Sequence, residues 1–266
     1  MTSRKLGIQV PLLPDGIDHT LDYIKRIRAT GFDAIFTPSL NDYQKELTAM
    51  LKTARDEGLE IDELHAPFKN INRMWYDEPI GDPVQKMMMD SVDICAAQGV
   101  EKMVMHECAN RIGPDMSNAG LKRFREIFLY AKEKGVKIAV ENLRRTNSLA
   151  RILFLNRDLD NVGYCWDCGH ELCYTPGVDH LAIFGDKVLC THIHDNQGVY
   201  MGDDHVLPFD GKTDWEKKAR LIKKCGYNGI MMMEVTRKGY EDLSDDAWLK
   251  EAYSRILRFA EMCDNA

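Results

Sequence analysis

Short runs of apolar residues recur along the chain, and they predict β-strands. Eight such runs can be identified, at 6–10, 34–38, 61–66, 102–106, 137–142, 162–167, 188–195 and 229–235. Between them lie segments in which apolar residues recur every three or four positions among charged ones, as in amphipathic helices. These helical segments are 17–30, 43–57, 83–98, 121–134, 215–225 and 244–263. The pattern therefore predicts strands and helices in alternation.

Glycine follows the end of several predicted helices and precedes the next strand. The glycines concerned are Gly31, Gly58, Gly99, Gly135 and Gly226. Glycine reaches the left-handed conformation at a helix C-terminus without the steric cost of a side chain. The repeated unit is therefore strand, loop, helix, glycine, strand.

This repeated unit predicts the fold class. Strands that alternate with helices form a parallel sheet with right-handed crossovers. Eight units in 266 residues match a (β/α)8 TIM barrel, and we predict one domain over residues 1–266. An open doubly wound sheet is the alternative. It is less favoured because no Gly-x-Gly-x-x-Gly follows the first strand, where the sequence is Pro-Leu-Leu-Pro-Asp-Gly.

Acidic residues and histidines end the predicted strands from the third strand onward. These residues are His65, His106, Glu141, Asp167, His192 and Glu234. In a barrel the carboxyl ends of all strands meet at one mouth, so we expect these six side chains to converge there. Three further candidates follow in the adjoining segments, namely His170, Asp203 and His205. His194 alternates with His192, so in a regular strand only one of the two faces the pocket.

A cluster of carboxylates and imidazoles at one mouth suits a divalent metal ion. Two Glu, one Asp and one His provide mostly hard oxygen donors, which favours Mn²⁺, Mg²⁺ or Co²⁺. Additional histidines shift the preference toward Zn²⁺. Glu141 and Glu234 each end a strongly apolar run, where a carboxylate must find a partner or a metal.

The charge balance and the apolar content limit the partners. The chain has 35 basic and 42 acidic residues, a formal charge of −7, whereas proteins that grip a nucleic acid backbone usually show a basic surplus. No apolar run reaches the roughly 18–20 residues of a membrane helix, and the N-terminus shows no secretory signal. We therefore expect no nucleic acid partner, no membrane association and a cytoplasmic location.

The cysteines and one basic segment each have a structural and a functional interpretation. The eight cysteines are scattered through apolar segments, which predicts reduced, mostly buried thiols. Cys165-x-x-Cys168 brackets a strand end instead of opening a helix, so packing is favoured over a redox role. Arg237-Lys238-Gly239, after the last strand, is either a solvated loop or a phosphate site.

Several short motifs occur in a characteristic order. They are His-Ala-Pro-Phe at 65–68, Glu-Asn-Leu at 141–143, Trp-Asp-x-Gly-His at 166–170, His-Ile-His-Asp-Asn at 192–196, Asp-Asp-His-x-Leu-Pro-x-x-Gly at 203–211 and the glutamate at 234. In this order and spacing the chain resembles the xylose isomerase-like barrel superfamily, from about residue 6 to the C-terminus. It looks most like members described as sugar phosphate isomerases/epimerases.

The resemblance implies a function in carbohydrate metabolism. In related ketose 3-epimerases one divalent metal is held by residues matching Glu141, Asp167, His192 and Glu234. For this chain the expected metal is Mn²⁺, with Mg²⁺, Co²⁺ or Zn²⁺ as alternatives. The two glutamates exchange protons on opposite faces of the sugar, and the metal stabilises the enediolate. The resemblance thus implies an isomerase or epimerase of a sugar or sugar phosphate, in a homo-oligomer. It places His170 on a substrate hydroxyl and Phe68, Trp75 and Trp166 as apolar walls.

A sister family, endonuclease IV, uses the same barrel with a trinuclear zinc cluster. Its ligands, matched by motif, would be His65, His106, Glu141, Asp167, His170, His192, Asp203, His205 and Glu234. The five residues outside the mononuclear set are therefore either substrate-binding or additional metal ligands. Against the nuclease, the chain is acidic and lacks clustered basic and aromatic loops for a bent duplex. Two further hypotheses are a metal-dependent keto-sugar or inosose dehydratase or lyase, and a non-catalytic binding protein.

Overall fold

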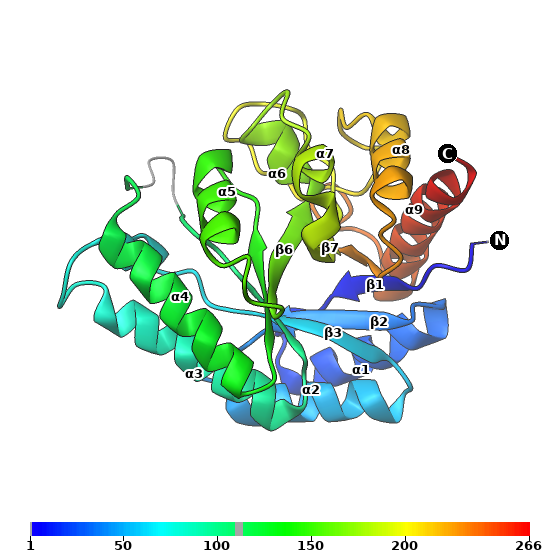
Figure 1. Ribbon diagram of the computed structural model, residues 1–266. Coiled ribbons are helices and arrows are strands. Elements are labelled where there is room, and N and C mark those ends of the chain that lie inside the picture. The colour runs from blue at the N-terminus through cyan, green and yellow to red at the C-terminus, as the bar shows by residue number, and fades with distance from the viewer. Residues whose placement is uncertain (1, 110–113) are drawn as a thin grey trace.

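Eight parallel strands form one sheet in the order β7-β6-β5-β4-β3-β2-β1-β8. The computed structural model describes residues 2–109 and 114–266 (Figure 1). The strands are β1 (Leu6–Gln9), β2 (Ala34–Pro38), β3 (Glu60–His65), β4 (Lys102–Met105), β5 (Lys137–Glu141), β6 (Val162–Asp167), β7 (Val188–His192) and β8 (Met231–Met233). A parallel bridge between Ile193 and Met233 joins the two edges, so the sheet is a nearly closed barrel. The predicted TIM barrel is thus confirmed.

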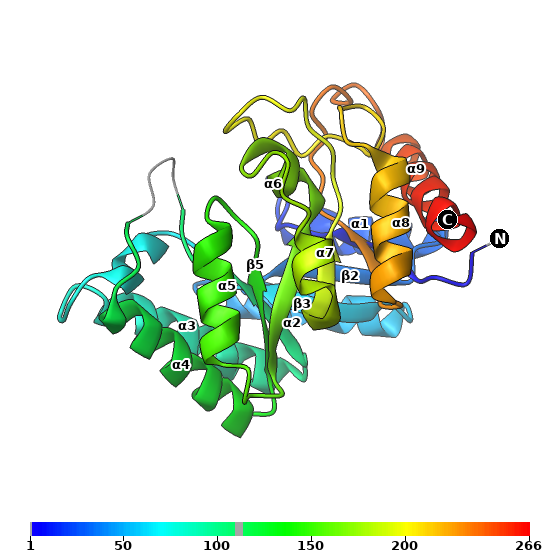
Figure 2. The same ribbon diagram turned by 45° about the horizontal axis from the view of Figure 1, so that its top comes forward.

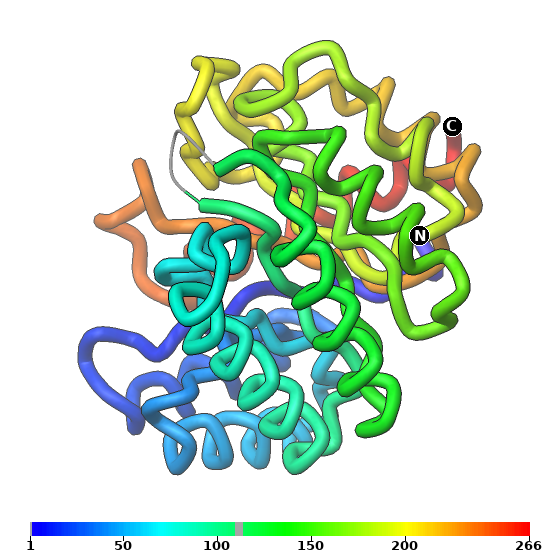
Figure 3. The backbone as a smooth tube through the Cα atoms, turned by 60° about the vertical axis from the view of Figure 1, so that its left-hand side comes forward, coloured from blue at the N-terminus to red at the C-terminus, as the bar shows by residue number. Residues whose placement is uncertain are grey.

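Helices surround the barrel and cover its strands (Figures 1 and 2). They are α1 (Ile17–Thr30), α2 (Gln44–Asp56), α3 (Asp82–Gln98), α4 (Asn118–Glu133), α5 (Thr146–Leu155), α6 (Cys168–Cys173), α7 (His180–Phe184), α8 (Trp215–Cys225) and α9 (Asp245–Asn265), with the 3-10 helices η1 (Ile71–Trp75) and η2 (Gly185–Lys187). Helices α1 to α4 follow one another along one flank in Figure 3. Helix α9 packs against α1 and α8, which brings the two ends of the chain to the same side. Among the helices in the described ranges, none has the length and hydropathy of a membrane span.

The hydrophobic pattern located most elements but missed three helices. Helices α1 and α8 have the predicted bounds, and Gly31 and Gly99 end α1 and α3 with φ of 116° and 66°. Helices α6 and α7 have six and five residues, too few for a helical period to show. Helix α5 ends in the continuous apolar run 152–155, which carries no helical period. Strand β7 ends at His192, three residues earlier than predicted.

The barrel interior is filled by small and medium side chains below the mouth. Val104, Ala139, Cys165 and Cys190 form one buried cluster there. All eight cysteines are free thiols, and all except the half-buried Cys225 are buried. Burial holds the pKa values of Cys165 and Cys168 well above their usual range. The thiols therefore serve packing, as predicted, and the nucleophilic thiolate needed for redox exchange is disfavoured.

Candidate metal centre

Four potential ligands converge at the mouth of the barrel. Glu141, Asp167 and His192 end β5, β6 and β7, and Glu234 directly follows β8. Each offers one donor atom, and these four atoms all lie within 4.8 Å of one another. We call these four residues the inner cluster. Their proximity follows from the parallel ladders, which bring successive strand ends to one level.

Hydrogen bonds fix the carboxylate of Asp167. The Asn142 side chain donates to the backbone oxygen of Asp167 at 2.8 Å and accepts from its backbone nitrogen at 2.7 Å, which ties β5 to β6. Asp167 Oδ1 accepts from the backbone nitrogen of His170 at 2.6 Å and so caps α6. His194 Nε2 lies 3.0 Å from the same oxygen. The carboxylate is therefore oriented before any ligand binds.

The imidazole of His192 is held from two sides. Its ring stacks on Phe36 with centroids 4.7 Å apart. Nε2 lies 3.3 Å from Oε1 of the buried Glu63, while Nδ1 faces Glu234 Oε2 at 3.1 Å and Glu141 Oε1 at 3.5 Å. A carboxylate on the far nitrogen is the usual support of a metal-binding histidine. Glu63 is not among the predicted site residues, although its spacing of two from His65 places both side chains on the interior face of β3.

The inner cluster is strongly polarised. Burial raises the pKa of Glu141, but His106 and His192 outweigh this effect and hold that pKa well below its usual value. Burial also raises the pKa of Glu234, and His192 again outweighs it and lowers the pKa of Glu234. Burial disfavours the imidazolium of His192, but Glu234 and Glu141 raise its pKa well above the usual value. The neighbouring imidazoles thus favour the ionised form of both glutamates, which is the form in which a carboxylate binds a metal.

Buried donor atoms test whether a metal fits the inner cluster. Glu141 Oε1 and His192 Nδ1 are buried and have no well-aligned hydrogen bond within the described structure, although each has ion-pair contacts at 3.1 to 3.5 Å. Such groups are costly to bury unless something binds them. Three carboxylates and one imidazole form a mainly hard donor set. The residues present therefore fit a divalent cation.

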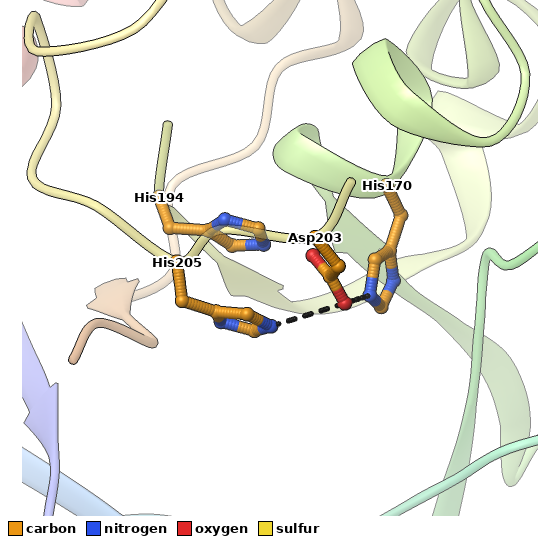
Figure 4. Close-up of side chains that lie close together, drawn as sticks. All are labelled: His170, His194, Asp203 and His205. Atoms are coloured by element: carbon orange, nitrogen blue, oxygen red, sulfur yellow. Dashed lines mark hydrogen bonds and ion pairs between the residues drawn. The ribbon is translucent and has the colours of Figure 1, made fainter. Parts of the chain in front are cut away.

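A second group lies beside the first (Figure 4). Asp203 Oδ2 lies between two histidines, 3.2 Å from His170 Nε2 and 3.3 Å from His205 Nε2. The Nδ1 atoms of the two rings face backbone carbonyls, that of Asn142 at 3.0 Å and that of Glu234 at 2.9 Å. Because a carbonyl only accepts, each Nδ1 carries a proton, and the Asp203 carboxylate favours a second proton on each Nε2 that faces it. We call His170, Asp203 and His205 the outer cluster.

His194 connects the two clusters. Its ring stacks on His205 with centroids 3.9 Å apart, and its Nε2 contacts Asp167. A Cβ atom on Gly169 would come within 2.0 Å of this ring, so only glycine permits the approach. The expectation that only one of His192 and His194 faces the site is wrong, because β7 ends at His192 and the alternation stops there.

The loop between β7 and α8 carries Asp203 and His205 and is anchored by Asp195. This buried carboxylate accepts hydrogen bonds from several loop groups. The donors are the backbone nitrogens of Asn196, Phe209, Gly211 and Thr213, the Thr213 hydroxyl and the indole of Trp215. His205 adopts the left-handed region at φ 47°, which is unfavourable for a residue with a side chain. The anchored loop thus imposes the position of His205.

His65 and His106 lie on a further side of Glu141. Their Nε2 atoms are 3.2 and 3.0 Å from Glu141 Oε2. Phe68 stacks on His106 with ring centroids 4.5 Å apart. The structure therefore brings together all nine candidate residues of the sequence analysis, with Glu141 shared between groups.

A cavity of about 1380 Å³ opens above these residues. Phe68 lines it, as expected, but two other predicted walls were wrong. Trp75 is buried and donates to the backbone oxygen of Glu107 at 2.7 Å, and Trp166 is fully buried beneath α8. Arg144 lines the cavity and was missed, because no motif marks it.

The basic loop after β8 has partners of its own. Arg237 pairs with Asp245 at 2.6 Å and also donates to a backbone carbonyl. Lys238 pairs with Asp204. These contacts favour the structural interpretation of residues 237–239 over a phosphate site.

Comparisons with known proteins agree with this fold. The family model described as xylose isomerase-like TIM barrel matches residues 24–258. An uncharacterized protein of Sinorhizobium fredii, y4fM, is 31% identical over 95% of this chain and 91% of its own length. An inosose isomerase of Bacillus licheniformis is 26% identical over 52% of this chain and 54% of its own length.

Solved structures show the same architecture. The IOLI protein with a bound zinc atom superimposes with a TM-score of 0.79 at 18% identity, over 97% of this chain and 98% of that one. L-ribulose 3-epimerase gives a TM-score of 0.75 at 16% identity, over 98% and 96% of the two chains. Sugar epimerases and isomerases are thus among the similar proteins. Since the family model spans most of the chain, this protein belongs to the xylose isomerase-like TIM barrel family.

Proposed function

We propose that this protein is a divalent-metal-dependent isomerase or epimerase of a ketose or ketose phosphate. One observation carries the proposal: Glu141 and Glu234 belong to one metal-capable cluster and both line the large cavity. Inverting the carbon next to a carbonyl needs an acid–base group on each face, and two carboxylates can provide both; transfer to the neighbouring carbon can use either of them. The similar inosose isomerase and L-ribulose 3-epimerase support the reaction class.

The inner cluster would hold the metal through Glu141, Asp167, His192 and Glu234. A bound divalent metal supplies Lewis acidity, which polarises a carbonyl and neutralises the negative charge that develops beside it. The chain provides the proton transfer: one glutamate accepts the proton α to the carbonyl, and the other delivers a proton to the opposite face or the neighbouring carbon. His192 favours the ionised form of each glutamate, so either can act as the base, and the glutamate that delivers the proton must carry it when the substrate binds.

The donor set also guides the choice of metal. Three carboxylates in the inner cluster favour Mn²⁺, which we propose, with Mg²⁺ and Co²⁺ as the next most suitable ions. Zn²⁺ is a further candidate, because the histidines of the outer cluster lie nearby and the IOLI structure holds zinc. His65, His106 and the outer cluster would contact the substrate or further metal ions.

Solvent deuterium exchange tests the reaction class. The Mn²⁺-loaded protein would be incubated in D2O with ketopentoses, ketohexoses, their phosphates and inososes, and the sugars analysed by mass spectrometry. We expect one deuterium in at least one sugar, at the carbon next to the carbonyl. No incorporation into any of them would contradict the proposal. A product lighter by one water would instead identify a dehydratase.

A phosphodiesterase is a second candidate. It is favoured because three groups of potential metal ligands lie side by side at the barrel mouth. His65 and His106, the inner cluster and the outer cluster together could hold several metal ions. The formal charge of −7 disfavours a duplex. Incubation of the Zn²⁺-loaded protein with abasic duplex DNA decides between the isomerase and the phosphodiesterase, and we expect no nicking.

The cytoplasmic location, the homo-oligomer and the single domain stay predictions.

A further inference from the structure

The cationic side chains around the cavity differ in their partners. Lys69, Lys86 and Arg144 line it among the described residues. Lys86 is paired with Asp90 one helical turn later. Lys69 is exposed, so water solvates its charge. Arg144 is partly buried, three residues after Glu141, and is therefore the cation whose charge the protein must accommodate.

The guanidinium of Arg144 has an aromatic neighbour but no anionic contact. Its Cζ lies 4.0 Å from the ring centroid of Tyr174. Its Nε is buried without a hydrogen-bond partner, and no ion pair joins it to any residue in 2–109 or 114–266. Glu107 is buried nearby, but its carboxylate accepts from Cys108 Sγ at 3.1 Å. An arginine is always charged, so this arrangement leaves its planar donors available.

Tyr174 holds the guanidinium in place. The tyrosine is 7% exposed, and its hydroxyl donates to Asp203 Oδ2 at 2.9 Å. This cation–π contact therefore places the guanidinium of Arg144 against a side chain that is itself bound to the outer cluster. The next residue behaves differently, because Arg145 contacts Asp115 at 3.4 Å and the backbone oxygen of Pro114.

We propose that Arg144 binds an anionic group of the substrate, a carboxylate or a phosphate. Guanidinium groups recognise both through two parallel hydrogen bonds, and a guanidinium already held against an aromatic ring loses little freedom on binding. This inference rests on the proposed function, since it names the substrate class of the same site. The substrate is then a sugar acid or a sugar phosphate, and a neutral sugar binds less tightly.

Calorimetric titration of the Mn²⁺-loaded protein tests this inference. The probes are a ketohexose, its 6-phosphate and the corresponding uronic acid. We expect one of the two anions to bind about tenfold to a hundredfold more tightly than the neutral sugar, the gain typical of a charge-assisted pair. The tighter of the two identifies phosphate or carboxylate as the recognised group.

Variants assign the preference to this side chain. Arg144→Gln is expected to abolish the preference for the anionic sugar, and Arg144→Lys to retain part of it. The control is Arg151→Gln, which changes an exposed arginine on α5 and should leave the preference unchanged. Equal binding of neutral and anionic sugars by the wild type, or the same preference in Arg144→Gln, would overturn the inference. Deuterium exchange is measured separately. An Arg144-dependent preference without exchange would reject the proposed reaction but retain the anion site.

Discussion

The inner and outer clusters share one mouth of the barrel but are supported differently. Three of the inner ligands end strands of the sheet, and the side chains of Glu141, Asp167 and His192 are at most 1% exposed. In the outer cluster Asp203 and His205 come from a loop and are 24% and 21% exposed. A ladder of parallel strands fixes the first group, whereas one buried carboxylate, Asp195, holds the loop of the second. The inner cluster is therefore positioned mainly by the sheet, and the loop residues of the outer cluster by side-chain hydrogen bonds.

Removing a carboxylate from the inner cluster should have the largest effect. Glu141→Gln and Glu234→Gln are each expected to lower the rate of α-proton exchange by about 10²- to 10⁴-fold, because each removes an acid–base group. The rate is measured by deuterium incorporation, and circular dichroism checks the fold. The control is Glu241→Gln, an exposed glutamate after β8. Wild-type exchange in both inner variants would refute the two-glutamate mechanism.

Loosening the loop should damage the outer cluster selectively. Asp195→Asn replaces an acceptor by an amide that faces backbone donors, so we expect a loss of about 2–4 kcal/mol in the free energy of unfolding. Urea denaturation measures it. Asp214→Asn is the control, since asparagine also caps a helix and should cost about 0.5 kcal/mol or less. Equal stability of the two variants would show that Asp195 does not anchor the loop.

Glu63 offers a test confined to the inner cluster. Glu63→Gln keeps the size of the side chain that supports His192 Nε2 but removes its charge. We expect metal affinity to fall about tenfold to a hundredfold, as for other residues behind a ligating histidine. Metal titration measures this, with Glu60→Gln on the exposed start of β3 as the control. If both variants bind metal like the wild type, Glu63 has no supporting role.

The outer cluster should respond to pH because a metal must displace its protons. Burial disfavours the imidazolium of His205, yet Asp203 raises its pKa to about 9. A metal that binds this imidazole releases one proton below that pH, so its affinity should fall about tenfold per pH unit as the pH drops. Calorimetry in buffers of different ionisation enthalpy counts the protons released. A pH-independent affinity between pH 6 and 8 would exclude His205 as a ligand.

The sequence revealed the inner cluster more fully than its surroundings. Glu141 and Glu234 could be located because each ends an apolar run, and a barrel brings all strand ends to one mouth. Nothing local, by contrast, shows that Glu63 supports His192, since the two lie on β3 and β7 and meet only across the closed barrel. The partner of Arg144 was hidden for a similar reason: Tyr174 follows α6, a helix too short to leave a periodic pattern.

The metal content of two matched histidine variants distinguishes the inner cluster from the outer cluster as the metal centre. The wild type, His192→Gln and His205→Gln would be loaded with Mn²⁺, dialysed and analysed for bound metal per chain, with circular dichroism to verify folding. If the inner cluster is the metal centre, the wild type and His205→Gln each retain at least one equivalent, and His192→Gln loses it. Full retention of metal by His192→Gln, with loss from His205→Gln, would place the metal in the outer cluster and contradict the account.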